Sequence, residues 1–392
     1  MDLKKTIISY PFNEQRHSIF SPIVELLSKK YNFIYDPKSS KVNSTLFKLA
    51  KNPFLKIAYY KHIRRFLSIR DIKLLFDKEK NNTALPCDLI FTCGVIPKFN
   101  NNYIIDVENV TALSGYDLRR LNKNKIEREF SQGRCKAILA YNDNSKESLI
   151  SVLNCNKFRD KIKVISFGMK SDHIQKKKHN KINLLFVGSV NNPIDFELKG
   201  GIIALEVYAE LTKIYRDISF TIRSYIPNWI KKKYGLLPGI KFIQDFVPKE
   251  EMKEIFLNSD IVLQPWPGMN LMLNCMNFAL PVVAFDAFMM PEMIFEGKTG
   301  FLVDSSNIFG NRINVKQYFN NLHLSFLKMY SRKVDTKTID EFIEKTSRLI
   351  NDEPLRERMG RNAKMLLEAN GRYNLKKNNA MVLSLFKLAL TQ

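Results

Sequence analysis

Residues 268–303, GMNLMLNCMNFALPVVAFDAFMMPEMIFEGKTGFLV, decide the fold of this chain. A helical stretch leads into a short apolar run from Pro281 to Asp286, and a turn and a last short strand follow. A run of this kind, entered through proline and left through aspartate, is typical of a strand buried on both faces of a parallel sheet. Because open α/β sheets bind ligands at the carboxyl ends of their strands, Asp286 and Glu292 are expected near a ligand crevice.

Short apolar strands alternate with helical stretches along the whole chain, which is the pattern of parallel sheets built from βαβ units. The predicted strands of the first half cover residues 6–10, 33–35, 88–93, 103–107, 137–141 and 163–167. Those of the second half cover residues 183–188, 219–224, 241–243, 260–264, 281–286 and 301–303. Between the halves, residues 169–181 are polar and basic without an apolar period, which indicates an interdomain linker.

The length of the chain favours two globular domains, because 392 residues are more than one ordinary compact core contains. Hydrophobic residues make up 45% of the chain, and no apolar run approaches the roughly 18 residues of a membrane-spanning helix. The start of the chain does not have the pattern of a signal peptide. Five cysteines without a C-x-x-C pair suit reduced thiols, so we expect a cytoplasmic protein.

The stretch 268–303 resembles the C-terminal half of GT-B glycosyltransferases of group 1, the GT4-like group. The positions in register with that group's signature, without a gap, are Met276, Pro281, Val282, Val283, Ala284, Asp286, Glu292, Ile294, Gly297, Gly300, Leu302 and Val303. The resemblance is strong over about residues 181–367 and weaker over the first half. It implies an α/β fold of two Rossmann-like domains that face a cleft.

The domains implied are an acceptor-side domain over residues 1–175 and a nucleotide-sugar donor domain over residues 181–372. A C-terminal helix over residues 373–392 is expected to cross back to the first domain. Residues 308–334 form an insertion between the last strand and the closing helices, and their apolar residues predict an extra helix.

The first predicted phosphate-binding turn follows the strand that ends at Gly188, where glycine permits a tight turn. Lys199 stands before a helix, where its charge and the exposed N–H groups can neutralise phosphate; on the residues alone, the favoured alternative is an ordinary solvated lysine. The resemblance implies the phosphate-binding role for Lys199, whereas Ser189 replaces an arginine of the group. Arg223, at the end of another strand, can supply the missing charge if it faces the same crevice; the alternative is a solvent-facing arginine.

The second predicted phosphate-binding turn begins a helix with Gly268, Met269 and Asn270, whose N–H groups point along the helix dipole towards an anion. The resemblance implies two glutamates around this helix, one near the transferred sugar and one on the nucleotide ribose. This chain has neither, because Trp266 and Asn274 stand there. Asn274 can still bond ribose hydroxyls, since an amide both donates and accepts. Trp266 either lines the sugar pocket or belongs to the core.

The resemblance also implies that Glu292 positions the hydroxyls of the donor sugar. The glycine pair that precedes this glutamate in the group is replaced by Phe288 and Met289, which narrows the space for a sugar. Val247 lies in the loop where relatives hold the base through backbone groups.

In the first half, Asp106 and Glu108 end a strand that is expected to face the interdomain cleft. One of them can orient or deprotonate the acceptor hydroxyl; the alternative is that they cap the following helix. Arg16 and His17 follow the first strand and are candidates for the acceptor side, although a lone histidine is usually structural. The chain has no D-x-D triplet and no His/Cys cluster of zinc spacing, so neither a metal nor a cofactor is expected.

The formal net charge of +23, with a pI near 9.6, favours anionic partners. Residues 38–70 contain no Asp or Glu and interleave cations with aromatic and aliphatic residues. Such a segment can lie on an anionic membrane, or form ordinary amphipathic helices with a solvated face.

The function predicted is a retaining glycosyltransferase that moves a sugar from a nucleoside-diphosphate donor to a saccharide or lipid-linked acceptor in cell-surface glycan synthesis. It would act in the cytoplasm, in peripheral contact with the membrane and without a specific nucleic-acid partner. Two alternatives stay open. One is a degenerate, non-catalytic GT-B protein that binds anionic membrane or nucleic acid, and the other is a nucleotide-sugar epimerase.

Overall fold

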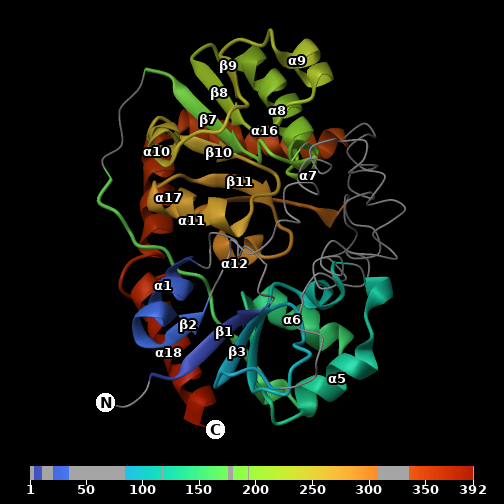
Figure 1. The fold of residues 1–392 in the computed structure, drawn as a ribbon. Coiled ribbons are helices and arrows are strands. Elements are labelled where there is room, and N and C mark those ends of the chain that lie inside the picture. The colour runs from blue at the N-terminus through green and yellow to red at the C-terminus, as the bar shows by residue number, and fades with distance from the viewer. Residues whose placement is uncertain are drawn as a thin grey trace.

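The computed structural model describes residues 4–10, 21–34, 84–116, 118–174, 180–192, 194–306 and 335–391. Within these ranges the chain forms two six-stranded parallel sheets, one in each half, with helices packed around them (Figure 1). Every strand predicted from the sequence is present. The basic segment 38–70, the insertion 308–334 and the candidate residues Arg16 and His17 lie outside the described residues.

The first half contains a sheet in the order β2-β1-β3-β4-β5-β6. Its strands are β1 (Thr6–Tyr10), β2 (Asn32–Ile34), β3 (Leu89–Cys93), β4 (Tyr103–Val107), β5 (Cys135–Ala140) and β6 (Ile162–Val164). Its helices are α1 (Ser21–Lys30), α5 (Lys123–Ser131) and α6 (Asp143–Val152), with the 3₁₀ turns η3 (Val110–Ser114), η4 (Leu118–Arg120) and η5 (Arg159–Lys161). The central strands β3 and β4 are buried along their length, as expected for strands covered on both faces.

The second half contains a sheet in the order β12-β11-β10-β7-β8-β9. Its strands are β7 (Ile182–Val187), β8 (Ile218–Arg223), β9 (Ile240–Ile243), β10 (Ile261–Leu263), β11 (Val282–Phe285) and β12 (Gly300–Val303). Its helices are α7 (Asp195–Leu198), α8 (Gly201–Ile214), α9 (Asn228–Tyr234), α10 (Lys249–Leu257), α11 (Met269–Asn277), α12 (Met290–Met293), α16 (Thr336–Asn351) and α17 (Glu353–Met365). The strand order reverses between β7 and β10, which is where such sheets bind ligands.

The two halves are joined twice, and the two connections touch each other. The backbone N–H of Met169, on the way to the second half, donates to the carbonyl of Tyr373, on the way back, at 3.1 Å. The returning chain forms α18 (Leu375–Thr391), which lies beside α1 of the first half (Figure 1). The ring of Phe386 on α18 packs edge-on against Phe91 of β3, with 5.2 Å between centroids. The predicted crossing helix is confirmed.

Helix α17 packs closely on the end of α11, where Ala279 has a left-handed backbone with φ of 51°. A Cβ on Gly360 of α17 would lie 2.0 Å from the carbonyl oxygen of Ala279, a contact that only backbone movement can relieve. We expect Gly360→Ala to lower the free energy of unfolding by about 1–3 kcal/mol, as overpacking does. Urea unfolding checks this, with Gly133→Ala as control, because a Cβ there meets nothing within 4 Å. Equal midpoints for the two variants would contradict the packing.

Candidate functional site

The two predicted phosphate-binding turns meet at the point where the strand order of the second sheet reverses. Lys199 ends the short helix α7, and Gly200 then turns with φ of 80° into α8. The carbonyl of Lys199 accepts a hydrogen bond from the backbone N–H of Trp266 at 3.2 Å. A Cβ on Gly268 would lie 3.4 Å from the Lys199 Nζ. The structure therefore places the Lys199 ammonium beside the first turn of α11.

This arrangement suits an anion. Gly268 is the N-cap residue of α11 and provides no side-chain cap. The half-buried Lys199 ammonium adds a full positive charge to the partial positive charge of the helix N-terminus. Met269 is buried in the first turn of α11, whereas Asn270 is exposed. The backbone contact between Lys199 and Trp266 holds the two turns side by side.

A buried glutamine holds the ends of the two central strands in register. Gln264 follows β10 and is fully buried. Its Oε1 accepts from the Val187 N–H at 2.8 Å, and its Nε2 donates to the Val187 carbonyl at 2.9 Å. The side chain thus continues the ladder between β10 and β7 beyond the last backbone pair. Gln264 was not among the predicted site residues, and its signal in the sequence is a glutamine that ends an apolar strand.

Arg223 joins the Gly188 turn. Its Nη1 donates to the Gly188 carbonyl at 2.9 Å, and its Nε is buried without a hydrogen-bond partner. Burial lowers the pKa of Arg223, while the nearby Asp195 carboxylate acts in the opposite direction. Asp195 also accepts from the Ser189 N–H at 2.7 Å. Gly188, Ser189 and Arg223 are thus brought together around Asp195. This acid was not among the predicted site residues, and its signal in the sequence is its position between Gly188 and Lys199.

The two residues that replace the expected glycine pair lie in different places. Phe288 packs on Trp266, with ring centroids 4.1 Å apart and ring planes at 33°. Its backbone is left-handed with φ of 55°, a conformation that costs a non-glycine residue roughly 1–2 kcal/mol. Met289 instead reaches the first half, where its sulfur accepts from Asn142 Nδ2 at 3.6 Å. Phe288 therefore adjoins the Lys199 turn, whereas Met289 belongs to the contact between the halves.

Asn274 bonds within α11, whereas Val247 lines a pocket beside β9. The Asn274 amide donates back along α11 to the carbonyl of Asn270, at 2.7 Å. Val247 lines a pocket of about 320 Å³ between β9 and α10, and no other predicted site residue lines that pocket.

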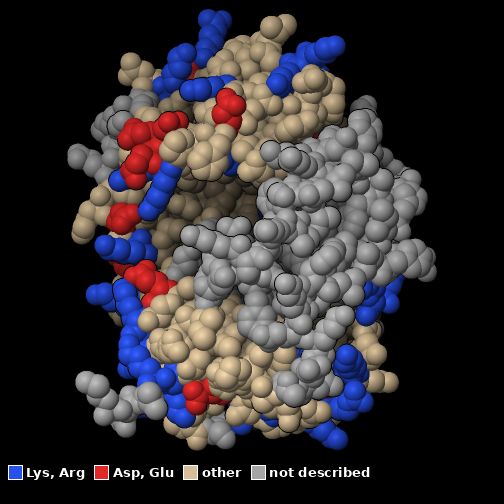
Figure 2. Space-filling view, viewed as in Figure 1, with Lys and Arg blue, Asp and Glu red and all other residues tan. Residues whose placement is uncertain are grey.

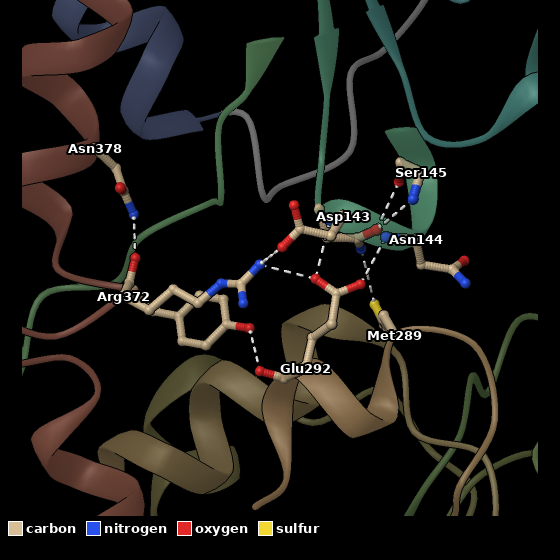
Figure 3. A network of polar contacts seen from close by, with 9 residues as sticks. Asp143, Asn144, Ser145, Met289, Glu292, Arg372 and Asn378 are labelled. Atoms are coloured by element: carbon tan, nitrogen blue, oxygen red, sulfur yellow. Dashed lines mark hydrogen bonds and ion pairs between the residues drawn. The ribbon is translucent and has the colours of Figure 1, made fainter. Parts of the chain in front are cut away.

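Glu292 has partners that differ from the sugar hydroxyls implied by the resemblance (Figure 3). Its carboxylate accepts from the backbone N–H groups of Asn144 at 2.6 Å and Asp143 at 2.9 Å, which begin α6 in the first half. Arg372 Nη2 lies 2.8 Å from the same carboxylate and 2.6 Å from the Asp143 carboxylate. The Tyr373 hydroxyl donates to the Glu292 carbonyl at 3.1 Å. Glu292 thus joins the two halves.

The physical reason is that a carboxylate at a helix N-terminus satisfies unpaired N–H groups and is stabilised by the helix dipole. The Glu292 side chain is only 16% exposed, so water screens these contacts weakly. Burial on its own lowers the pKa of Arg372, but Tyr373, Asp143 and Glu292 together raise it above its ordinary value. The guanidinium therefore stays charged at this contact.

Asp106 and Glu108 differ in burial. Asp106 is 2% exposed and accepts from the Tyr141 hydroxyl at 3.3 Å. Burial, with a smaller effect of Asp106, raises the pKa of Tyr141 well above its ordinary value. Glu108 is exposed and accepts from the Tyr116 hydroxyl at 2.7 Å. The cap of η3 is Asn109, which accepts from the Thr111 N–H at 3.0 Å, so the alternative that the two acids cap this helix is wrong.

The carboxyl edges of the two sheets face each other. Residues that follow β5 meet residues that follow β11, as the contacts of Asn142 with Met289 and of Asn144 with Glu292 show. Figure 2 shows a hollow between the two halves. The predicted cleft is present between the two sheets.

The comparisons with known proteins agree with this geometry. A family model described as glycosyl transferases group 1 matches residues 181–314. No curated protein matches the sequence. Among solved structures, Alr3699/HepE from Anabaena, in complex with UDP and glucose, has a TM-score of 0.55 at 12% identity, over 98% of this chain and 100% of that chain. A glycosyltransferase from Rickettsia africae has a TM-score of 0.55 at 16% identity, over 99% of each chain.

A mutant of TarM from S. aureus, in complex with Fondaparinux, alpha-GlcNAc-glycerol and UDP, has a TM-score of 0.50 at 13% identity. The match covers 78% of this chain and 55% of the TarM chain. The predicted GT-B fold is confirmed by these structures, and the resemblance to group 1 glycosyltransferases is confirmed over the matched residues.

Proposed function

We propose that this chain is a glycosyltransferase that takes a sugar from a nucleoside-diphosphate donor, with retention of configuration, and passes it to a saccharide or lipid-linked acceptor. The observation that carries the proposal is the Lys199 ammonium beside the uncapped N-terminus of α11, at the strand reversal of the second sheet. The match to group 1 glycosyltransferases covers this region.

Transfer of the sugar requires that the protein stabilise charge more than that it form a covalent bond to the substrate. As the glycosidic bond to the diphosphate breaks, negative charge grows on the leaving oxygen. A fixed ammonium and oriented N–H groups stabilise that charge without reorganising, which lowers the barrier. Lys199 and the first turn of α11 serve this purpose. The proposed reaction uses no metal and no cofactor.

On the acceptor side, we assign Glu108 as the carboxylate that orients or deprotonates the acceptor hydroxyl. It is exposed at the end of β4, whereas Asp106 is buried and bonded to Tyr141. A base must reach the proton it removes, which favours the exposed carboxylate.

None of the described helices is long and apolar enough to cross a bilayer. The proposal includes a peripheral contact of residues 38–70 with an anionic membrane.

A thermal-shift screen against UDP, GDP, ADP and their sugars tests the proposal. UDP is the first choice, because the TarM and HepE complexes contain it. We expect one diphosphate to raise the melting temperature, since ligand at 100 times its Kd adds about 2.7 kcal/mol to stability. The matching monophosphate should act less, because it lacks one of the two phosphates.

Two other outcomes separate the alternatives. No shift from any nucleotide, together with salt-sensitive binding to arbitrary DNA, would indicate a non-catalytic protein. Release of a changed nucleotide sugar in the absence of any acceptor would indicate an epimerase.

A further inference from the structure

A second cationic site lies in the first half, on the segment that leads from β4 to α5. The turn η4 and the start of α5 line an open hollow of about 470 Å³. Its described lining consists of residues 119–124, which include the cations Arg119, Arg120 and Lys123 and no acid. The proposed donor site lies in the second half and shares no residue with this hollow.

The sequence of η4 explains why two of these cations are at the surface. Leu118 and Leu121 pack against the hydrophobic core of the first half, and the Leu121 N–H donates to the Leu118 carbonyl at 3.0 Å. Between the two leucines, Arg119 is exposed and Arg120 is half-buried. The packing of the leucines thus fixes the short turn from which both arginines extend.

The start of α5 adds to the positive charge of the hollow. Asn122 caps this helix by accepting from the Lys125 N–H at 3.0 Å, and Lys123 is the first helical residue. A helix N-terminus carries a partial positive charge, which stabilises an anion nearby. Three full charges and one helix terminus are therefore gathered at one hollow.

The two glutamates of α5 are bonded to groups that do not line the hollow. Glu127 accepts from the Asn154 N–H at 2.8 Å, and Glu129 is ion-paired with Arg134. Each of these carboxylates has a partner of its own, so neither depends on the cations of the hollow for compensation.

The hollow lies on the same segment as the carboxylate assigned to the acceptor hydroxyl. Glu108 follows β4 and accepts from the Tyr116 hydroxyl at 2.7 Å. Arg119 is three residues beyond Tyr116, so at most about 11 Å of chain separates their backbones. One continuous segment thus supplies both the proposed base and the cations.

The residues of the hollow suit phosphate. A guanidinium presents a planar fork of N–H groups that matches the oxygens of phosphate or carboxylate, and an ammonium adds a point charge. A phosphate monoester carries about −1.5 to −2 charges at pH 7, whereas a carboxylate carries one. Three cations in six consecutive residues therefore favour the phosphate.

We propose that the acceptor carries a phosphate ester that binds in this hollow to Arg119, Arg120 and Lys123, while a hydroxyl of the same acceptor meets Glu108. The role of the hollow rests on the proposed function, because that function makes the first half the acceptor side. The phosphate belongs either to a glycosyl phosphate or to a lipid phosphate, and the two sources are separated by the choice of probe.

Calorimetric titration measures the binding directly. The probes are glucose 1-phosphate and farnesyl phosphate, and methyl glucoside is the uncharged comparison. The nucleotide selected by the thermal-shift screen is present at saturation, so that the donor site is occupied; if no nucleotide binds, the Lys199→Ala variant is titrated instead. We expect one or both phosphates to bind more weakly as salt is raised, because exposed charges are screened. Tighter binding of farnesyl phosphate would indicate a lipid phosphate, and tighter binding of glucose 1-phosphate a glycosyl phosphate.

Two double variants that remove the same charges test the location of the phosphate. Arg120→Gln/Lys123→Gln is expected to raise the Kd of the bound phosphate about 10-fold or more, since contacts to charged groups are among the stronger ones. The matched control is Lys125→Gln/Arg128→Gln, which also removes one lysine and one arginine. Lys125 and Arg128 are exposed on α5 and do not line the hollow, so the control should raise the Kd by less than about 2-fold. Melting temperatures of both variants verify that they are folded.

The outcomes keep this inference apart from the proposed function. The phosphate site is refuted if neither phosphate binds the parent, if methyl glucoside binds as tightly as the phosphates, or if the two double variants have equal effects. In each of these cases the nucleotide screen still decides the glycosyltransferase proposal by itself. If phosphate binds as expected but no nucleotide does, the phosphate site stands and its role on the acceptor side is refuted with the proposed function.

Discussion

Replacement of Lys199 by alanine is expected to lower the turnover number about 100- to 1,000-fold while the protein stays folded. The magnitude is that of removing one preorganised donor at a site of developing charge. The ammonium lies beside the first turn of α11, so the variant removes the full charge and leaves only the helix terminus. Turnover is measured with the donor and acceptor that support activity in the parent protein.

The matched control for this variant is Lys232→Ala. Lys232 is exposed on α9, at the end of the second half remote from the first (Figure 1), and its removal changes the net charge by the same amount. Lys199→Arg keeps the charge and should retain more activity than Lys199→Ala. A Lys199→Ala preparation that turns over as fast as the parent would remove Lys199 from the site.

Glu292→Gln and Arg372→Met are expected to have the same effect, a loss of about 2–3 kcal/mol of unfolding free energy and a more open arrangement of the halves. The reason is that each removes one partner of a weakly screened ion pair, and a hydrogen bond to a charged group contributes about 1.5–3 kcal/mol. Glu292→Gln also turns an amide donor towards groups that already donate, namely the N–H groups of Asp143 and Asn144 and the Arg372 guanidinium. Urea unfolding and small-angle scattering measure the two effects.

Arg361→Met is the control for these variants. Arg361 pairs with Glu357 one turn away on the surface of α17, and such exposed pairs contribute only about 0.3–0.5 kcal/mol. If Glu292 instead binds the donor sugar, as the resemblance implies, Glu292→Gln should weaken sugar-nucleotide binding while Arg372→Met does not. That divergence would refute the interdomain role, whereas a shared loss of stability would support it.

The strands and the helix α17 are predictable from the sequence because their causes are local. An apolar run such as Val282–Phe285 is a buried strand in almost any context of alternating strands and helices. Likewise Asp352 caps α17 through the Leu355 N–H at 2.8 Å, a contact three residues along the chain. The proximity of Lys199 to the N-terminus of α11 is also predictable from the sequence, because both follow strands that end at the same edge of one sheet.

The sequence by itself therefore determined the two parallel sheets, their order along the chain and the cationic turn at the strand reversal. Only the tertiary structure decided that Glu292 and Met289 serve the contact between the halves and that Phe288 stacks on Trp266. Glu292 lies 148 residues from Asn144 in sequence, so no local pattern reports their contact. The physical reason is that a carboxylate binds whichever N–H groups and cations the fold brings to it, and that choice depends on how two separately formed sheets are docked.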